Sequence, residues 1–342
     1  MRLATITLAV LWSFAASSAL SADKFGIFET IHESSVSFDE TTEAVEAAIQ
    51  SSDLELHGSH VVRLPDDTHQ AKIYVLHSPA YVQAAKAESA RTVSAQVLRI
   101  AVYTWGEDLK TYVNMANPVA HAMVFYAGSA DYDYLVKSAV KAADEIRGLV
   151  SAIPGTVVAN PIEPLRTEKH YNKYKGDGPA RMMAKFRTWR KSQLLIESDR
   201  EENFDAVVAR VTAALAAGTV SPASEDPTGW ETIASIRIRD DAHYVGVTNP
   251  YIEDKMVSIN SRFRKDGKSD AAPYPGVDHL TALPTDILII KEGGETLVLH
   301  YGQMWRMQLY FWDSGYRAFT ANVGVPSAIA NSIEAAFFTP GK

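Results

Sequence analysis

The segment that decides the fold is Leu98–Tyr126, LRIAVYTWGEDLKTYVNMANPVAHAMVFY. Its first two apolar runs, 98–105 and 111–115, are rich in β-branched and aromatic residues and flank the polar turn GEDLK. Such a composition is typical of a β-hairpin. The third run, VAHAMVFY, follows Asn117-Pro118, and we interpret it as a further, longer strand.

A second segment near the C-terminus repeats this layout. Residues 286–312, DILIIKEGGETLVLHYGQMWRMQLYFW, again give a run, a Gly-acidic turn, a run and a longer run. Two helical stripes also match, at a constant separation of 166 residues: Phe38, Thr42, Val45 and Ile49 against Phe204, Val208, Val211 and Leu215. Matches at one offset, followed by the same order of elements, predict an internal duplication.

We therefore predict an α+β fold of two similar units, residues 22–155 and 189–342, joined by a basic linker at 156–188. Each unit is expected to contain a strand, a helix, four antiparallel strands and a helix. A capping box of Ser37 and Glu40 predicts where the first helix begins. The units differ between their third and fourth strands. The first has a helix at 80–96, whereas the second has a long loop, Arg262–His279, which we expect to act as a lid or a partner contact.

The N-terminus has the layout of a secretory signal peptide. Arg2 precedes a short apolar run, and small residues follow it, which predicts cleavage after Ser21. No other stretch is long and apolar enough to span a bilayer, so we expect a periplasmic protein that is not an integral membrane protein. The chain has no cysteine, which excludes disulfides, thiolate metal sites and covalent c-type haem.

The net charge argues against nucleic acid as the main partner. It is -8 for the whole chain, with 33 basic and 41 acidic residues, and becomes -9 when Arg2 leaves with the signal peptide. The segment Glu163–Lys191 is basic with interleaved aromatic residues. It is either a docking surface for an anionic partner or a linker that pairs with acidic faces of the two units.

Both units resemble the family catalogued as domain of unknown function 302, whose members have a TBP-like α+β fold. The residues that carry this resemblance are VTNPYI and LPTDILIIKEGGETLVLHYG in the second unit and RIAVYTWGEDLKTYVNMANP in the first. Members of that family often place Cys directly after the Leu-Pro, whereas Thr285 occupies the position here. The resemblance implies a fold and brings no catalytic residues with it.

One hypothesis for the His and Met residues of the two longer runs is a copper site. His121 and Met123 are two residues apart and would share one face of a strand, where Met115 of the neighbouring strand could join them. His300 and Met304 would share a face in the second unit. Imidazole and thioether ligands suit copper. The alternative is that the Met side chains fill the core and hydrogen bonds satisfy both His rings.

The aromatic residues near the C-terminus indicate a second candidate site. Tyr301 and Trp305, with their aromatic neighbours, could line a pocket for a flat or apolar ligand, including non-covalent haem with His300 as axial ligand. His243 and His279 could also contact the ligand. Each could instead form an acid/base pair with the Asp near it in sequence, Asp241 for His243 and Asp278 for His279, and the alternative is that both Asp–His pairs lie in surface turns. The alternative is that these aromatic residues form the core and the interface between the units.

Three functions remain open at this point. The preferred one is an exported, non-enzymatic binding or accessory protein for a small ligand, copper or haem. The second is a periplasmic enzyme with His243 or His279 as the base. The third is a structural partner of an envelope protein complex, bound through the basic linker.

Overall fold

The structure is a computed structural model that describes residues 24–158, 166–173, 186–200, 202–217, 229–257, 277–311, 320 and 322–337. It has the predicted α+β class, with antiparallel sheets. The predicted signal peptide and nearly all of the predicted loop at 262–279 lie outside the described residues. None of the described helices combines the length and apolar character needed to cross a membrane.

The N-terminal sheet has the order β3-β4-β5-β6-β2-β7. Its strands are β2 (Phe28–Ser34), β3 (Glu55–Val61), β4 (Ala71–His77), β5 (Leu98–Trp105), β6 (Lys110–Ala116) and β7 (Gly155–Val157). The predicted hairpin is confirmed as β5 and β6. Helices α1 (Phe38–Gln50) and α4 (Tyr132–Val150) complete this half, and α1 begins at the predicted capping box of Ser37 and Glu40.

The C-terminal sheet has the order β10-β11-β12-β13-β9. Its strands are β9 (Gln193–Asp199), β10 (Glu231–Arg239), β11 (Ala242–Thr248), β12 (Thr285–Glu292) and β13 (Glu295–Tyr301), and α6 (Phe204–Ala216) and α10 (Val325–Phe337) are its two long helices. Counted along the chain within each sheet, both sheets place the second, third, fourth, fifth and first strands side by side, with β7 added at the edge of the N-terminal sheet.

Part of the segment assigned to the linker is folded. Within 156–188, the end of β7 extends the N-terminal sheet, β8 (Arg166–Thr167) pairs with β1 (Lys24–Phe25), and α5 (Glu168–Lys173) follows. The 3-10 helix η3 (Phe186–Ser192) then leads into β9. The Tyr171 hydroxyl donates a hydrogen bond to the Phe25 carbonyl oxygen at 2.8 Å, which holds α5 against the N-terminal half.

Both longer runs that we interpreted as strands are helices, so that prediction was wrong. They form α3 (Pro118–Phe125) and α8 (Gln303–Phe311). All eight residues of α3 are buried. A helix buried on every side has no polar face, and its sequence therefore lacks the 3.6-residue periodicity that distinguishes a helix from a buried strand.

The segment 80–96 and its counterpart in the second half also differ from the prediction. The single expected helix is α2 (Pro79–Ala84) followed by the 3-10 helix η1 (Ala90–Gln96). The second half also begins this connection with a helix, α7 (Pro250–Val257), and ends it with the 3-10 helix η5 (Val277–Ala282). Both α2 and α7 begin with Pro after a residue whose short side chain can cap a helix, Ser78 or Asn249.

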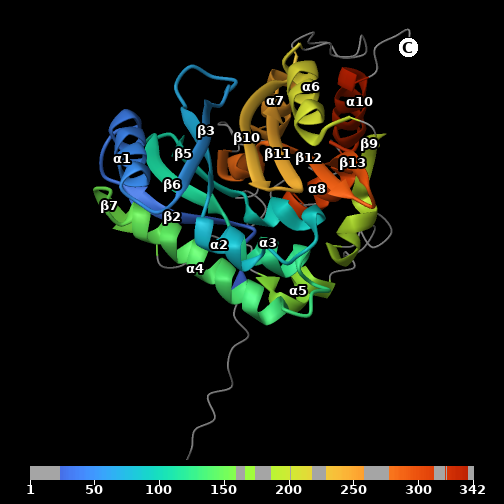
Figure 1. Cartoon of the computed structure of the whole chain (residues 1–342). Coiled ribbons are helices and arrows are strands. Elements are labelled where there is room, and N and C mark those ends of the chain that lie inside the picture. Colours follow the sequence, from blue (N-terminus) through green and yellow to red (C-terminus); the bar gives the residue numbers. More distant parts are fainter. Residues whose placement is uncertain are drawn as a thin grey trace, which may run out of the picture.

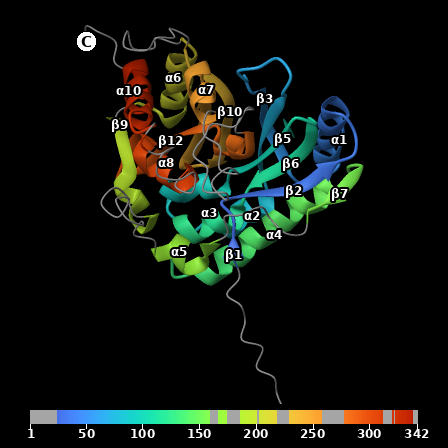
Figure 2. The ribbon, with the colours of Figure 1, turned by 180° about the vertical axis from the view of Figure 1, so that it is seen from behind.

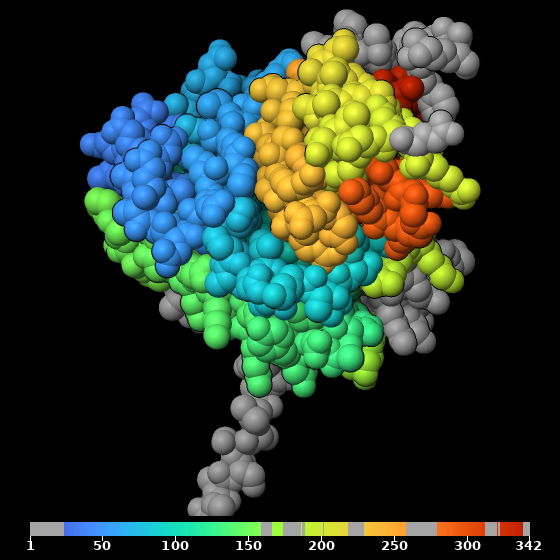
Figure 3. All heavy atoms as spheres, in the orientation of Figure 1, coloured from blue at the N-terminus to red at the C-terminus, as the bar shows by residue number. Residues whose placement is uncertain are grey.

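The two halves pack against each other. In Figure 1, α4 and α5 lie below the two sheets, and Figure 2 shows the same arrangement from behind. The packing is reciprocal: η1 contacts β11 and β12 of the C-terminal sheet, and η5 contacts β4, β5 and β6 of the N-terminal sheet. The edge strands β3 and β10 also meet, and Figure 3 shows their surfaces in contact.

Candidate functional site

A pocket that is partly open to solvent lies in the C-terminal half between α7, α8, α10 and the start of β12. Most of its wall is apolar: Ile252, Met256, Met307, Phe311, Val325, Pro326 and Ile329. Polar groups come from Lys255, Gln303, Arg306 and Tyr310, among others, and none of the described lining residues is acidic. Apolar walls with a few polar groups are the usual form of a small-molecule site.

Arg306 of α8 is the buried cation of this pocket, with only 6% of its surface exposed. Its Nη2 atom donates hydrogen bonds to the carbonyl oxygens of Ala282, at 2.6 Å, and Pro284, at 3.3 Å. Its Nη1 atom is buried and has no hydrogen-bond partner. Leaving such a donor unpaired costs about 1–3 kcal/mol, so an acceptor atom supplied by a ligand would be strongly favoured here.

The charges behind the pocket do not balance. A second buried guanidinium, Arg99 of β5, has its Nη1 atom 3.9 Å from Oδ1 of Asp286, and the Tyr244 hydroxyl donates to the same oxygen at 2.8 Å. Asp286 is therefore shared by Arg99 and Tyr244, and Arg306 has no ion pair among the described residues. Among the described residues named here, two buried guanidinium groups stand against one buried carboxylate, so the buried charge at the pocket floor sums to a positive value.

Tyr310 of α8 connects the pocket to the N-terminal half. Its ring lines the pocket, and its hydroxyl accepts a hydrogen bond from Nη2 of Arg99 at 2.9 Å. The hydroxyl also lies 3.0 Å from Nε2 of His121 on α3. Nδ1 of His121 donates to the Asn117 carbonyl oxygen at 2.8 Å, so Nε2 is the acceptor of this neutral ring. Burial, and then the charge of Arg99, lowers the pKa of His121 to about 3.

The four residues predicted to bind a ligand are buried outside the pocket lining. His243 of β11 bonds Ser235 at 2.7 Å, and burial lowers its pKa to about 4. His279 of η5 packs between the rings of Phe28 and Phe311. Tyr301 and Trp305 stack on each other with ring centres 5.3 Å apart.

The stacked pair of Tyr301 and Trp305 belongs to an aromatic cluster between the two halves. Phe125 of α3 contacts both rings and also Trp189 of η3, with ring centres 5.2 to 5.8 Å apart. The cluster therefore corresponds to the core-and-interface alternative rather than to a ligand pocket.

The predicted metal ligands are not brought together on strand faces. His121 and Met123 are two positions apart on the helix α3, where residues at that spacing point in widely different directions. Nε2 of His121 faces the guanidinium of Arg99 at 3.0 Å, and a cation at that place disfavours a metal ion. Met115 lies fully buried on β6.

The second predicted pair fails for the same reason. His300 is on β13, but Met304 follows in the helix α8, so the shared strand face does not exist. His300 is 1% exposed, and burial lowers its pKa to about 4. It is not among the residues that line the pocket, so it is not placed to serve as an axial ligand for haem bound there.

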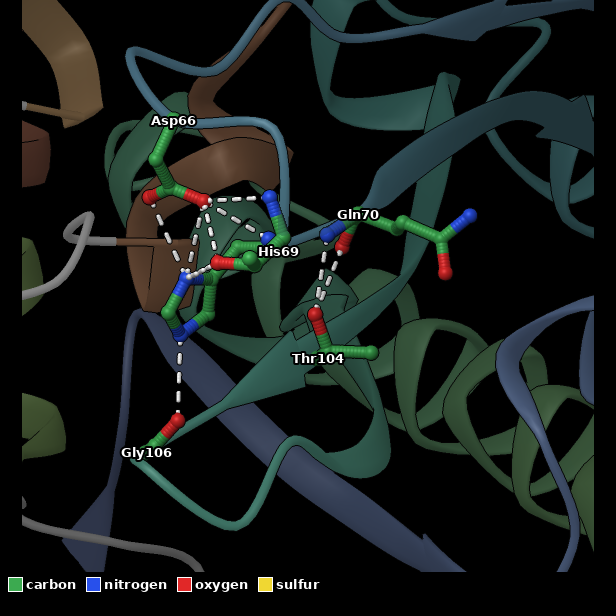
Figure 4. A network of polar contacts seen from close by, with 6 residues as sticks. Asp66, His69, Gln70, Thr104 and Gly106 are labelled. Carbon is green, nitrogen blue, oxygen red and sulfur yellow. Dashed lines mark hydrogen bonds and ion pairs between the residues drawn. The ribbon is translucent and has the colours of Figure 1, made fainter.

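Another His–carboxylate pair, Asp66 and His69, joins the loop after β3 to the β5–β6 turn (Figure 4). Asp66 accepts hydrogen bonds from the backbone amides of Thr68 and His69 at 2.9 and 2.7 Å. Nδ1 of His69 lies 3.1 Å from Asp66, and its Nε2 lies 3.0 Å from the carbonyl oxygen of Gly106. Both ring nitrogens are occupied, so this pair stabilises the loops and is not arranged as a general base.

Arg306, the cation of the pocket, was not among the site residues predicted from the sequence. Arg306 lies in the apolar run QMWRMQLYF, and Arg99 lies in LRIAVYTW. An arginine inside an apolar run is a signal of a buried charge that needs a partner, because unpaired charges are rarely buried. Both segments carry that signal. The metal hypothesis instead used His and Met residues and left the two arginines out.

The scan against protein-family models finds no match, and the search of the curated proteins finds none either. Among solved structures, the chain is similar to the "Crystal structure of uncharacterized conserved protein DUF302 from Bacillus stearothermophilus". The two chains are 16% identical with a TM-score of 0.31, and the match covers 38% of this chain and 99% of the other.

Proposed function

We propose that this chain is an exported binding protein for a small molecule with an apolar body and an anionic group. The single observation that carries the proposal is the pocket between α7, α8 and α10, which has apolar walls and a buried Arg306 with an unpaired Nη1 atom; within the described part of the chain, no acidic residue lines it. A carboxylate group would satisfy that donor and neutralise the positive floor.

The apolar walls argue for a ligand with a hydrocarbon or aromatic body. Met256, Met307 and Phe311 supply adaptable and flat surfaces, and burial of each methylene group of a ligand contributes about 0.8 kcal/mol. A small, fully polar anion would leave these walls without contacts. The combination favours medium-chain or aromatic carboxylates over inorganic anions.

Export and duplication are part of the same proposal. The Arg2-initiated apolar run supports periplasmic export, and the common strand order of the two sheets supports descent of the two halves from one repeated unit. In this interpretation only the C-terminal half uses the space between its helices for a ligand. The corresponding helices of the N-terminal half, α2 and α3, are packed against α4.

The direct test compares two probes of equal chain length, decanoate and decanol, by isothermal titration calorimetry with the full mature chain. The proposal expects decanoate to bind more tightly. It also expects Arg306→Gln to weaken decanoate binding by about tenfold or more, since a charge-assisted hydrogen bond contributes about 1.5–3 kcal/mol. Decanol binding should change little in the same variant.

The matched control is Arg200→Gln, because the Arg200 side chain is 78% exposed and pairs with Glu295 outside the pocket. It should bind both probes as the unmodified chain does. Ile329→Trp, which adds volume to the pocket wall, should weaken binding of both probes. Equal affinity for decanoate in the unmodified and Arg306→Gln chains would contradict the proposal.

A further inference from the structure

Three side chains with metal-binding chemistry meet on the edge of the N-terminal sheet, away from the pocket. They are Glu55 and His57 of β3 and His77 of β4, and one possible ligand atom from each lies within 4.8 Å of the other two. Nε2 of His57 lies 2.5 Å from Nδ1 of His77. Oε2 of Glu55 is 3.4 Å from Nε2 of His77 and 4.0 Å from Nε2 of His57.

The strand register explains why these residues converge. Glu55 and His77 are directly paired across the antiparallel strands, and cross-strand partners point to the same face of a sheet. The pairing passes from Leu56 to Gly58 on β3 while it advances by one residue on β4, so His57 is the extra residue of a β-bulge. Bulges often redirect a side chain at the edge of a sheet.

The edge of β3 that does not pair with β4 is in contact with β10 of the C-terminal sheet. A Cβ atom added at Gly58 would lie 1.8 Å from the carbonyl oxygen of Ile233 on β10, so the backbones of the two edge strands touch there. The cluster therefore sits at one end of the contact between the two halves. The His57 and His77 side chains are 21% and 12% exposed, whereas Glu55 is 58% exposed, which keeps one side of the cluster open to solvent.

The protonation states favour metal binding. Burial lowers the pKa of His57, and the neighbouring His77 lowers it further. Burial also lowers the pKa of His77, and the charge of Glu55 partly opposes this. Neutral imidazole is the form that binds a metal ion, and the proton between the two facing ring nitrogens can move to the other nitrogen of its own ring when the metal binds.

We propose that Glu55, His57 and His77 form a binding site for one divalent transition-metal ion, with zinc as the reference ion and water completing its coordination. Two imidazoles and one carboxylate are a common protein ligand set for zinc, and such open sites keep a position for water. Zn–N bonds of about 2.0–2.1 Å in tetrahedral geometry separate two ligand nitrogens by about 3.4 Å. The rings must therefore move apart slightly on binding, which the half-buried position of His57 on the β-bulge permits.

The experiment uses the full mature chain, treated with a chelator and titrated with Zn²⁺ at pH 7.5 by isothermal titration calorimetry. One ion per chain is expected. His57→Gln and His77→Gln should each weaken binding by tenfold or more, and Glu55→Gln should weaken it measurably. X-ray absorption of the zinc-loaded chain should show imidazole and oxygen ligands without sulfur.

The matched control is Glu43→Gln, because Glu43 is an exposed glutamate of α1 outside the cluster. It should bind zinc as the unmodified chain does. Circular dichroism of each variant separates loss of the site from loss of the fold. Absence of stoichiometric zinc binding, or equal affinity in a folded chain that carries both His substitutions, would overturn the proposal; neither result depends on the pocket around Arg306.

Discussion

At the scale of single residues, the chain is organised around buried charges with incomplete sets of partners. Arg99 is 2% exposed, and its Nη2 atom bonds both His121 and Tyr310 while its Nε and Nη1 atoms have no hydrogen-bond partner. The stability of the chain should be sensitive to the loss of any one member of this network, because the remaining buried groups cannot form replacement hydrogen bonds to water. The hydroxyl of Tyr310 is the member that can be removed with the smallest change in side-chain shape, because Phe keeps the ring.

We therefore expect Tyr310→Phe to lower the free energy of unfolding by about 1–3 kcal/mol, since it leaves buried polar groups of Arg99 and His121 less satisfied. Urea denaturation would measure the change. The control is Tyr134→Phe, because Tyr134 is 57% exposed, and its effect should stay within about 0.5 kcal/mol. Similar effects of the two substitutions would contradict the role assigned to the network.

Asp66 gives a prediction with a defined pH window. Burial acts to raise the pKa of Asp66, but hydrogen bonds from His69 and Thr68 outweigh it and lower the pKa from 3.8 to about 2. A carboxyl with a depressed pKa contributes stability above its unfolded pKa and loses it as the pH falls through the folded value. Because Asp66 is 35% exposed, we expect a contribution of only about 1 kcal/mol after solvent screening.

Asp66→Asn should therefore cost about 1 kcal/mol at pH 6 and progressively less between pH 4 and pH 2. Urea denaturation at several pH values would measure the difference. The neighbouring Asp67→Asn is the control, because Asp67 is exposed and accepts none of the hydrogen bonds described for Asp66. A cost that does not depend on pH would show that the carboxylate charge is not the source of the stability.

At the scale of elements, the sequence predicted what depends on local signals. The capping box of Ser37 and Glu40 located α1, and the polar turn between Trp105 and Lys110 located the β5–β6 hairpin. Helices α3 and α8 were missed because burial on nearly every side removes periodicity from their sequences. Asn117-Pro118, a cap followed by Pro, was the local signal that a helix begins there.

The candidate site was less predictable than the fold for a related reason. The pocket is built from α7, α8 and α10, and its shape depends on how these helices pack, which no short motif encodes. The convergence of Glu55, His57 and His77 depends on the pairing register and on a bulge at His57. A one-residue change of register would move these side chains to opposite faces of the sheet.

The contact between β3 and β10 tests the packing of two edge strands. Gly58→Ala should lower the free energy of unfolding by about 1–3 kcal/mol or more, since the new Cβ atom forces the two backbones apart. Thermal unfolding would measure the effect. Gly128→Ala is the matched control, because nothing lies within 4 Å of a Cβ atom added there. Equal melting temperatures for the two variants would show that the strands do not press together at Gly58.

At the scale of the whole molecule, a buried ion pair joins the two halves. Nε2 of His60 on β3 lies 2.7 Å from Oε1 of Glu253 on α7, and the same carboxylate accepts hydrogen bonds from the Arg63 amide and the Thr248 hydroxyl. Burial acts to lower the pKa of His60, but Glu253 and, more weakly, Glu231 outweigh it, so the pKa is raised.

A His with a raised pKa contributes stability that is complete below its unfolded pKa of about 6.5 and is lost as the pH rises through the folded value. His60→Gln should therefore cost more stability at pH 5.5 than at pH 8.5. Denaturation of both chains at the two pH values would measure the difference. A larger cost at the higher pH would show that the ring is neutral in the folded chain.

Tyr310 gives the pocket a consequence that reaches beyond its walls. The ring that an occupant would touch carries the hydroxyl that holds Arg99, and Arg99 belongs to the central strands of the other sheet. Replacing one half by a related domain would therefore require compensating substitutions in the other half, because the Arg99 guanidinium of the N-terminal half donates a hydrogen bond to the Tyr310 hydroxyl of the C-terminal half. Ligand binding in the proposed pocket would therefore depend on the correct packing of both halves.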